Sequence, residues 1–346
     1  MLAKIDGENV IVENEKDANK IHTKWKYGKL VDDSTLKLDP AEALHLFESK
    51  KLVIESKEIQ LGDIFDKFSA IDERFEQRSM IYKDLRKRGY RIDCFHELKE
   101  KGIDFHIKPK REDEREGFVV AINERETFYI REIRNWLDHI DPIIETLWLG
   151  VVDDEGDITY YSVERSIPKG TLNDVRGIKC KGMLIRNRVI IIDSEVAKEI
   201  FERGFYGKLV GNSLHLSLTE ALYLTSIDVI DVYYKGNMLS FDELKEIALS
   251  LQPDIEKRYA VYKDLKERGL CVKTGYKFGS HFRAYERDPH KYHAEYLIDV
   301  IDTDFNSSWT NISRGIRLAH SVRKLYAMAV IDKGNIDYIT IERVRP

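Results

Sequence analysis

The two halves of this chain repeat each other. Residues 82–89 read YKDLRKRG and residues 262–269 read YKDLKERG, an offset of 180 (262 − 82). Near the ends of the halves, GDITYYSVER at 156–165 matches GNIDYITIER at 334–343, an offset of 178 (334 − 156). Small insertions in a tandem duplication produce such a drift, and a period this long indicates duplicated domains rather than a solenoid. Each half must therefore fold by the same plan.

Composition narrows the class of protein. The chain has 346 residues, enough for two cores, and 34% of them are charged. It has no apolar run of the ~18 residues that a membrane span needs, and its first residues lack the apolar core of a signal peptide. The three cysteines are an odd number without CxxC spacing, which argues against a disulfide framework or a zinc site. We therefore expect a cytoplasmic protein. With a net charge of −5, any nucleic-acid binding requires a local basic patch.

The first part of each half has short strand patterns alternating with helices. A helix is predicted to begin at Asp39–Pro40, and another at Ser194 as its N-cap. Ser217 and Glu220 have the spacing of a capping box. These patterns predict an α+β subdomain in each half.

The second part of each half opens with a charged helix that ends at Gly89 or Gly269. An apolar strand follows at 118–123 or 295–302, then a helix and a β-hairpin. The predicted class is therefore α+β, or mixed α/β, in tandem. The expected boundaries are a first repeat at 1–166, a linker at 167–182 and a second repeat at 183–346, itself divided into 183–253 and 254–346.

The two copies differ at residues that could carry chemistry. Aligning FVVAIN (118–123) with YLIDVI (296–301), and Phe105 with Phe282, matches three polar residues of the second half to different residues of the first. The pairs are Tyr285 with Lys108, His293 with Arg115, and Lys324 with Thr146. This difference favours one working copy and one copy kept for architecture.

A tyrosine, a histidine and a lysine can cleave RNA without a metal. One group removes the 2′-OH proton, one protonates the 5′-leaving oxygen, and a cation stabilises the charge that develops on phosphorus. The chain has no HExxH pattern, paired acidic cluster or glycine-rich phosphate loop. We therefore expect neither a metal site nor a cofactor. Taken singly, each of the three residues also fits an ordinary packing or surface position.

Three motifs in order resemble the catalytic domain of the archaeal tRNA-splicing endonucleases. Tyr285 closes F-G-x-x-F-R-x-Y, which begins at Phe278; His293 opens H-x-E-Y-L-I; Lys324 follows S-V-R. The similarity covers nearly the whole chain, because one class of this family is a tandem fusion whose first unit is degenerate and whose chains form a homodimer. The resemblance implies a nuclease-like α/β subdomain with a mixed central sheet after each N-terminal subdomain.

The resemblance also implies an activity and roles. The substrate would be precursor tRNA with bulge–helix–bulge splice sites, cut to 2′,3′-cyclic phosphate and 5′-OH ends. Tyr285 would be the general base, His293 the general acid, and Lys324 the group that stabilises the transition state. An ordinary tyrosine has a pKa near ~10, so we expect Lys324 to lower the pKa of Tyr285.

Two arginines would grip a flipped RNA base in this family. The matching positions resemble Arg317, on the helix before Lys324, and Arg343, near the C-terminus. Guanidinium groups stack on unpaired bases. Arg165 holds the repeat position of Arg343, which is the argument for a purely structural role, and Arg345 is a close alternative.

The hairpin turns near the ends of the two halves differ in charge. The first turn contains Asp153, Asp154, Glu155 and Asp157, whereas the second reads Asp332, Lys333, Gly334, Asn335. A solvated turn would explain the acids. The resemblance implies instead that the acidic turn is a dimer contact that enters a basic pocket of the other chain.

Two other functions remain open from the sequence. One is a non-catalytic RNA-binding or assembly subunit, which the first half alone would fit. The other is a metal-dependent nuclease with Glu295 and Asp299 as ligands, although no lysine follows in E-x-K spacing. Cleavage in the presence of EDTA separates these alternatives.

Overall fold

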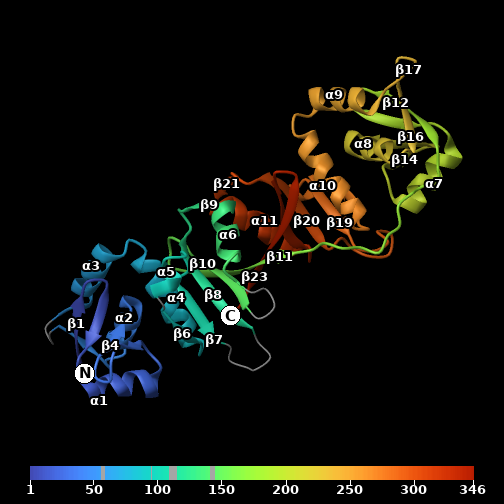
Figure 1. Cartoon of the computed structure of the whole chain (residues 1–346). Coiled ribbons are helices and arrows are strands. Elements are labelled where there is room, and N and C mark those ends of the chain that lie inside the picture. Colours follow the sequence, from blue (N-terminus) through green and yellow to red (C-terminus); the bar gives the residue numbers. More distant parts are fainter. Residues whose placement is uncertain (56–58, 95, 109–114, 141–144) are drawn as a thin grey trace. The chain divides into compact units, whose positions relative to one another are not determined.

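A computed structural model of the chain describes residues 1–55, 59–94, 96–108, 115–140 and 145–346 (Figure 1). It divides into two compact units. Unit 1 comprises Met1–Glu164, Asn306–Ser313 and Ile341–Pro346, and unit 2 comprises Arg165–Phe305 and Arg314–Thr340. Each unit is described by itself. Within the described residues no helix combines the length and apolar character needed to cross a membrane.

Unit 1 begins with a five-stranded sheet in the order β3-β4-β2-β1-β5. Neighbouring strands are antiparallel except β1 and β5, which are parallel. Helix α2 begins at Pro40, and the side chain of Asp39 caps it by accepting a hydrogen bond from the backbone N–H of Ala41 (2.9 Å). The predicted helix start is confirmed. The elements are β1 (Leu2–Asp6), β2 (Asn9–Val12), α1 (Glu15–Asn19), the π-helix Lys20–Lys24, β3 (Lys29–Leu30), β4 (Leu36–Leu38), α2 (Pro40–Glu48), β5 (Val53–Ile54) and α3 (Leu61–Ile71).

Unit 2 opens with a sheet of the same plan, in the order β14-β15-β13-β12-β16-β17. Here too the central strand, β12, is antiparallel to its hairpin partner and parallel to the strand after the helix. Ser217 and Glu220 form the predicted capping box. Helix α7, however, is capped by Asp193 rather than by Ser194, because the Asp193 carboxylate accepts from the N–H groups of Glu195 and Val196. The elements are β12 (Cys180–Ile185), β13 (Arg188–Ile191), α7 (Ser194–Gly204), β14 (Lys208–Val210), β15 (Ser213–Ser217), α8 (Leu218–Ser226), β16 (Ile230–Tyr234), β17 (Asn237–Met238) and α9 (Phe241–Leu251).

The rest of unit 1 is a mixed sheet in the order β6-β7-β8-β10-β11, with α4 packed on it. Strands β8 and β10 are parallel, whereas the β6–β7, β7–β8 and β10–β11 pairs are antiparallel. Strand β9 pairs with β21, which belongs to the same unit. The elements are α4 (Phe75–Lys87), β6 (Arg91–Asp93), α5 (His96–Lys99), β7 (Phe105–Lys108), β8 (Glu116–Asn123), β9 (Thr127–Tyr129), α6 (Ile130–Leu137), β10 (Glu145–Val152), β11 (Ile158–Ser166) and β21 (Asn306–Ser308).

Unit 2 contains the corresponding sheet, in the order β18-β19-β20-β22-β23, with α10 packed against β18 and β20. Strands β20 and β22 are parallel, as β8 and β10 are, whereas the β18–β19 and β19–β20 pairs are antiparallel. The predicted mixed α/β class is therefore confirmed. The elements are α10 (Ile255–Glu267), β18 (Cys271–Thr274), the 3₁₀ turn Tyr276–Phe278, β19 (Phe282–Tyr285), β20 (Tyr296–Asp302), α11 (Trp309–Ser321), β22 (Leu325–Asp332) and β23 (Asn335–Val344).

The segment between β11 and β12 has no regular secondary structure, yet it is fixed to unit 2. The backbone N–H groups of Gly170 and Leu172 donate to the carbonyls of Arg268 and Gly269 (both 2.9 Å). A Cβ at Gly170 would lie 2.2 Å from the carbonyl oxygen of Gly269, so this approach requires a glycine. The segment expected to be a linker is thus bound along the body of the second repeat.

Candidate active site

Strand pairing brings Tyr285 and Lys324 to the same edge of the unit 2 sheet. Ala284 on β19 pairs with Tyr296 on β20, and Tyr296 pairs with Leu325 on β22. One residue further along these ladders, Tyr285 and Lys324 come to lie on either side of Glu295. Backbone bonds fix this step: the N–H of Glu295 donates to the Ala284 carbonyl (3.0 Å), and the N–H of Leu325 donates to the Glu295 carbonyl (2.8 Å).

His293 is exposed and lies in the chain segment just before this edge. Between it and Glu295 is Ala294, which is buried against Tyr285 and Cys271. The two-residue step from His293 to Glu295 therefore keeps the imidazole close, along the chain, to the edge that carries Tyr285 and Lys324. Strand pairing thus brings Tyr285 and Lys324 next to Glu295. His293 is close to them because it lies only two residues before Glu295 in the chain.

The phenol of Tyr285 lies in an apolar environment. Its side chain is 8% exposed and packs with Cys271 and Ala294, while Leu172 and Phe205 contact the same cluster. Burial raises the pKa of Tyr285 above its ordinary value; Arg283, whose guanidinium lies 5.7 Å from the Tyr285 ring, opposes this shift. The expectation that Lys324 lowers the pKa of Tyr285 is therefore wrong: burial raises this pKa, and the cation that opposes the shift is Arg283.

The ammonium group of Lys324 is shifted in the opposite direction. Partial burial and the charge of Arg283 lower the pKa of Lys324, while Glu295 opposes them. The ammonium donates to the carbonyl of Val322 (3.3 Å). Lys324 lies three residues after Ser321, the last residue of α11, and its N–H donates to the Ala319 carbonyl (2.9 Å), which fixes the backbone of Lys324 at the helix end.

The two acids considered as metal ligands are already engaged. Asp299 accepts from the phenol of Tyr326 (2.8 Å) through one oxygen and lies 3.1 Å from Nδ1 of His281 through the other. Glu295 accepts from the backbone N–H of Glu286 (2.9 Å). In this arrangement Glu295 orders the edge between Tyr285 and Lys324, and Asp299 orders the loop of His281.

The same register corrects the comparison between the two repeats. Lys108 does lie at the position of Tyr285, since Arg91 pairs with Lys108 as Cys271 pairs with Tyr285. The β7–β8 ladder then continues from Ile107 and Gly117 to Lys108 and Glu116, so Glu116 corresponds to Glu295. Glu145 pairs with Glu116 and thus takes the place of Lys324. The alignment of the two repeats by sequence was therefore shifted by one residue in this region. The counterpart of Lys324 in the first repeat is Glu145, not Thr146. By the same shift Arg115 is not the counterpart of His293, whose matching position, 114, lies outside the described residues.

Comparisons with known proteins find two family domains in this chain. A family model described as the N-terminal domain of tRNA intron endonuclease matches residues 1–64 and 180–245. The model of the catalytic C-terminal domain matches residues 255–338, which contain Tyr285, His293 and Lys324. A protein of Methanococcoides burtonii named tRNA-splicing endonuclease is 33% identical over 359 residues, covering 100% of both chains. The chain belongs to the tRNA-splicing endonuclease family.

Some relatives match the whole chain, whereas others are shorter and match only part of it. A tRNA-splicing endonuclease of Methanosarcina mazei is 33% identical and covers 100% of this chain and 99% of its own. That of Thermococcus onnurineus is 40% identical over 148 residues, which are 86% of its length but 42% of this chain. The family thus includes full-length relatives of this chain and shorter members that match less than half of it.

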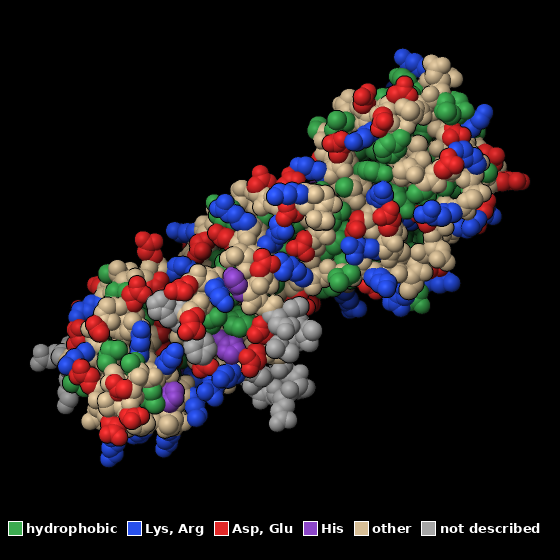
Figure 2. All heavy atoms as spheres, viewed as in Figure 1, with side chains coloured by type: hydrophobic (Ala, Val, Ile, Leu, Met, Phe, Trp, Pro, Cys, Tyr) green, Lys and Arg blue, Asp and Glu red, His purple; other side chains and the backbone are tan. Residues whose placement is uncertain are grey.

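The two arginines predicted to contact RNA are both exposed. Arg317 lies on α11, the helix that ends just before Lys324, and Arg343 lies on β23. Arg165, the repeat counterpart of Arg343, instead donates from Nε to Asp337 (3.3 Å). Figure 2 shows basic and acidic side chains interspersed over the face that it draws.

The acidic residues of the first hairpin turn are not equivalent. Asp153 is half-buried, and its carboxylate accepts from the N–H groups of Glu155 (3.0 Å) and Asp157 (2.9 Å). Asp154, Glu155 and Asp157 are exposed, and Asp154 also accepts from Arg125 (2.7 Å). Asp153 therefore shapes the turn, while the other three acids present the charge.

Unit 2 contains a basic cleft of about 530 Å³ between its two subdomains. Arg188 and Lys208 are exposed there, and neither makes an ion pair with a described residue. Lys273 donates to the Gly207 carbonyl (3.0 Å), and Arg258 pairs with Asp254 (2.5 Å). Four cations thus line the cleft, and Glu220 is the single acid among its lining residues.

Sequence reasoning missed two residues that shape the site. Arg283 affects the pKa of both Tyr285 and Lys324, and its place two residues before Tyr285 on one strand face was the available signal. Leu172 contacts the Tyr285 cluster from the interrepeat segment. A single leucine in an irregular segment carries no periodicity, so no sequence signal could have found it.

Proposed function

We propose that this chain removes introns from precursor tRNA by cleaving the RNA at bulge–helix–bulge splice sites. The observation that carries the proposal is the ladder that sets Tyr285 and Lys324 on either side of Glu295, within the segment matched by the catalytic-domain model. Relatives named tRNA-splicing endonuclease align with the chain over its whole length.

In the proposed reaction the ribose 2′-oxygen attacks the adjacent phosphorus while the bond from phosphorus to the 5′-oxygen breaks. Ionised Tyr285 accepts the 2′-OH proton, and His293 donates a proton to the departing 5′-oxygen. The Lys324 ammonium stabilises the extra negative charge on the phosphoryl oxygens. The products are a 2′,3′-cyclic phosphate and a 5′-OH end. No cofactor takes part in these steps.

Arg317 and Arg343 hold the RNA in this proposal. Their exposed guanidinium groups can stack on a base that the bulge leaves unpaired. Stacking of this kind contributes about 1–3 kcal/mol per base. The first repeat, with Lys108, Glu116 and Glu145 at the edge that corresponds to the active site, has an architectural role.

The active form in this proposal is a homodimer. The exposed acids Asp154, Glu155 and Asp157 of one chain enter the basic cleft of the other, where Arg188 and Lys208 make no ion pair with a described residue. Two such contacts related by a two-fold axis give a closed dimer. Charge complementarity of this kind selects the partner and speeds association.

Cleavage of an intron-containing precursor tRNA in EDTA tests the proposal. The wild type should cut both junctions and leave cyclic-phosphate ends, whereas His293→Ala should lower the single-turnover rate by about 10²–10⁴-fold with little change in RNA binding. Lys108→Ala, at the first-repeat counterpart of Tyr285, is the matched control and should keep the wild-type rate. Tight RNA binding without cleavage by the wild type would favour the assembly-subunit alternative instead.

A further inference from the structure

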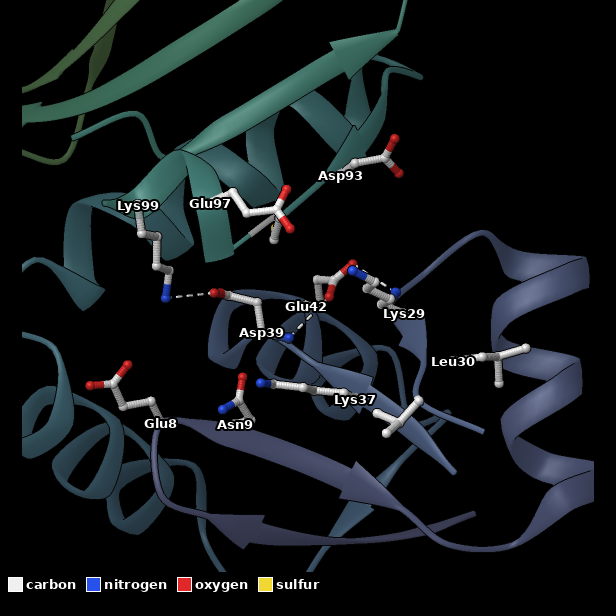
Figure 3. Close-up of a pocket in the computed structure, with 13 residues that line it drawn as sticks. Glu8, Asn9, Lys29, Leu30, Lys37, Asp39, Glu42, Asp93, Glu97 and Lys99 are labelled. Carbon is white, nitrogen blue, oxygen red and sulfur yellow. Dashed lines mark hydrogen bonds and ion pairs between the residues drawn. The ribbon is translucent and has the colours of Figure 1, made fainter. Parts of the chain in front are cut away.

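Unit 1 contains a cleft at the place where unit 2 has its basic cleft. It measures about 390 Å³ and is lined by residues of the N-terminal sheet together with β6 and α5 (Figure 3). Gly28 and Glu42 lie in it as Gly207 and Glu220 lie in the cleft of unit 2. In both clefts the buried glutamate accepts from the N–H of that glycine, at 2.9 and 2.8 Å.

The charge of the unit 1 cleft is opposite. Figure 3 shows acidic side chains on several sides of it, from β6 and α5 as well as from the N-terminal sheet and its connections. Three lysines line it, but one of them, Lys99, is bound to Asp39 (2.9 Å). The acids in the lining are Glu8, Asp39, Glu42, Asp93 and Glu97.

Strand register and the helix caps identify three positions at which the two clefts differ in charge. Asn9 is the β2 residue that pairs with Asp6, and Arg188 is the β13 residue that pairs with Ile185 at the same hairpin. Asp93 on β6 occupies the place of Lys273 on β18. Asp39 caps α2 as Ser217 caps α8. At these three positions unit 2 has the more positive residue. Lys29 and Lys37, by contrast, take the places of Lys208 and His215, so the inversion comes from the other positions and from the added acids Glu8 and Glu97.

The acids of the first cleft differ in their burial and pairing. Asp39 is buried, and its carboxylate lies 3.0 Å from the guanidinium of Arg78. Burial alone would raise the pKa of Asp39, but Arg78 and Lys99 lower it to about 2, so the carboxylate keeps its charge. Glu8 and Glu97 are exposed and make no ion pair with another described residue. An anionic group that entered this cleft would meet uncompensated carboxylates at the mouth.

We infer that the two clefts are charge-inverted copies of one docking site, and that the acidic cleft of unit 1 excludes the acidic hairpin turn. This inference rests on the proposed docking of Asp154, Glu155 and Asp157. Each chain then has one donor turn and one acceptor cleft, so two chains saturate each other. With two equivalent acceptors, a turn could enter the wrong cleft and leave the assembly open.

Photocrosslinking tests the exclusion. Glu155 is replaced by p-benzoylphenylalanine, isotope-labelled and unlabelled chains are mixed, and peptides crosslinked between chains are identified by mass spectrometry. In the otherwise wild-type chain, crosslinks to the unit 2 cleft should exceed those to the unit 1 cleft by at least about tenfold. Equal crosslinking to both clefts would overturn the inference but leave the docking proposal intact. A monomeric mass without interchain crosslinks would overturn the docking proposal itself.

A triple variant tests the cause. Glu8 precedes Asn9 as Asn187 precedes Arg188. Glu8→Asn, Asn9→Arg and Asp93→Lys therefore give the unit 1 cleft the residues of unit 2 at these positions, while Asp39 stays in place to hold Arg78. Crosslinks should now divide between the clefts within about threefold, and species larger than the dimer should form. Crosslinks that still go to unit 2 alone would refute charge as the cause.

The reciprocal variant keeps the test decisive if the triple variant does not fold. Arg188→Asn with Lys273→Asp makes the unit 2 cleft resemble that of unit 1. Interchain crosslinking and the association constant of the dimer should both fall by at least about tenfold. A dimer of wild-type affinity in this folded variant would also overturn the inference.

Discussion

The backbone N–H of Leu325 donates a hydrogen bond to the carbonyl of Glu295 at 2.8 Å. This bond begins the parallel pairing of β20 with β22 and holds Lys324 next to the segment that carries His293. Residues 31 positions apart in the chain (324 − 293) thus share one sheet edge. The position of the cation is set by a ladder rather than by a loop, which is the kind of rigid support that transition-state stabilisation requires.

Removal of this cation should impair the chemical step. We expect Lys324→Ala to lower the single-turnover cleavage rate by about 10²–10³-fold, because one preorganised charge at the phosphoryl group is lost. RNA affinity should change little. Glu145→Ala, the first-repeat counterpart, is the control and should cleave at the wild-type rate. An equal loss in both variants would assign the effect to folding.

Cleavage should depend on pH through two groups shifted in opposite directions. The pKa of Tyr285 is raised and that of Lys324 is lowered. A base that must be ionised makes the rate rise with pH, and the rise ends when Lys324 loses its proton. Arg283 lowers both pKa values, so Arg283→Met should move the whole profile to higher pH.

At neutral pH the rate of Arg283→Met should fall about tenfold for each unit by which the pKa of Tyr285 rises. Single-turnover rates across the pH range, corrected for cleavage of the RNA without enzyme, measure this shift. A profile that keeps its position in Arg283→Met would remove Tyr285 as the base.

A buried arginine stabilises the first repeat. Arg78 is 1% exposed and pairs with Asp39 (3.0 Å), Asp104 (2.9 Å) and Asp72. Arg78→Met removes this cation from all three carboxylates, although Lys99 still contacts Asp39 and Arg74 still contacts Asp104. The free energy of unfolding should fall by about 3–5 kcal/mol. Its counterpart Arg258 is half-buried and pairs with Asp254 alone, so Arg258→Met should cost less than about 1 kcal/mol. Urea unfolding of both variants measures the difference.

The same cluster should make the first repeat sensitive to acid. The pKa of Asp39 is lowered from 3.8 to about 2 because Arg78 and Lys99 favour its charged form. This group therefore contributes about 2 kcal/mol of stability that is complete above its ordinary pKa and is lost as the pH falls through about 2. In Arg78→Met the loss should begin at higher pH. Unfolding followed by circular dichroism during acid titration would show a shared midpoint if the prediction is wrong.

The exposed and the half-buried acids of the first hairpin turn should behave differently when changed. Asp154→Lys with Glu155→Lys should yield monomers without loss of stability, because both side chains are exposed. Asp153→Ala should lower stability by about 1–3 kcal/mol, because two backbone N–H groups lose a charged acceptor. Sedimentation reports the first effect and thermal unfolding the second. Lys333→Glu, in the corresponding turn of the second repeat, should leave the mass unchanged.

Local chemistry in the sequence predicted local structure well. The capping box of Ser217 and Glu220 is present because its bonds join residues three apart, and only the cap of α7 moved, from Ser194 to Asp193. The exact alignment of the two repeats was harder to predict from the sequence. Insertions shift the offset between repeats, so Lys324 was matched to Thr146, and only the pairing of Glu116 with Glu145 gives the true counterpart. The raised pKa of Tyr285 depends on burial by distant segments, which no local pattern encodes.

The segment between the repeats should influence catalysis through Tyr285. Leu172 packs against the cluster of Tyr285, Cys271 and Ala294, and its N–H is bound to the Gly269 carbonyl (2.9 Å). Leu172→Ala opens space beside the phenol, so kcat should fall about tenfold while KM for the RNA stays unchanged, since small misplacements of a reacting group reduce rate. Leu172→Met should restore most of the rate by refilling the space. Ile167→Ala, at a residue of the same segment that is 78% exposed, is the control and should have no effect. A rise in KM without a change in kcat would place Leu172 in RNA binding instead of in the support of Tyr285.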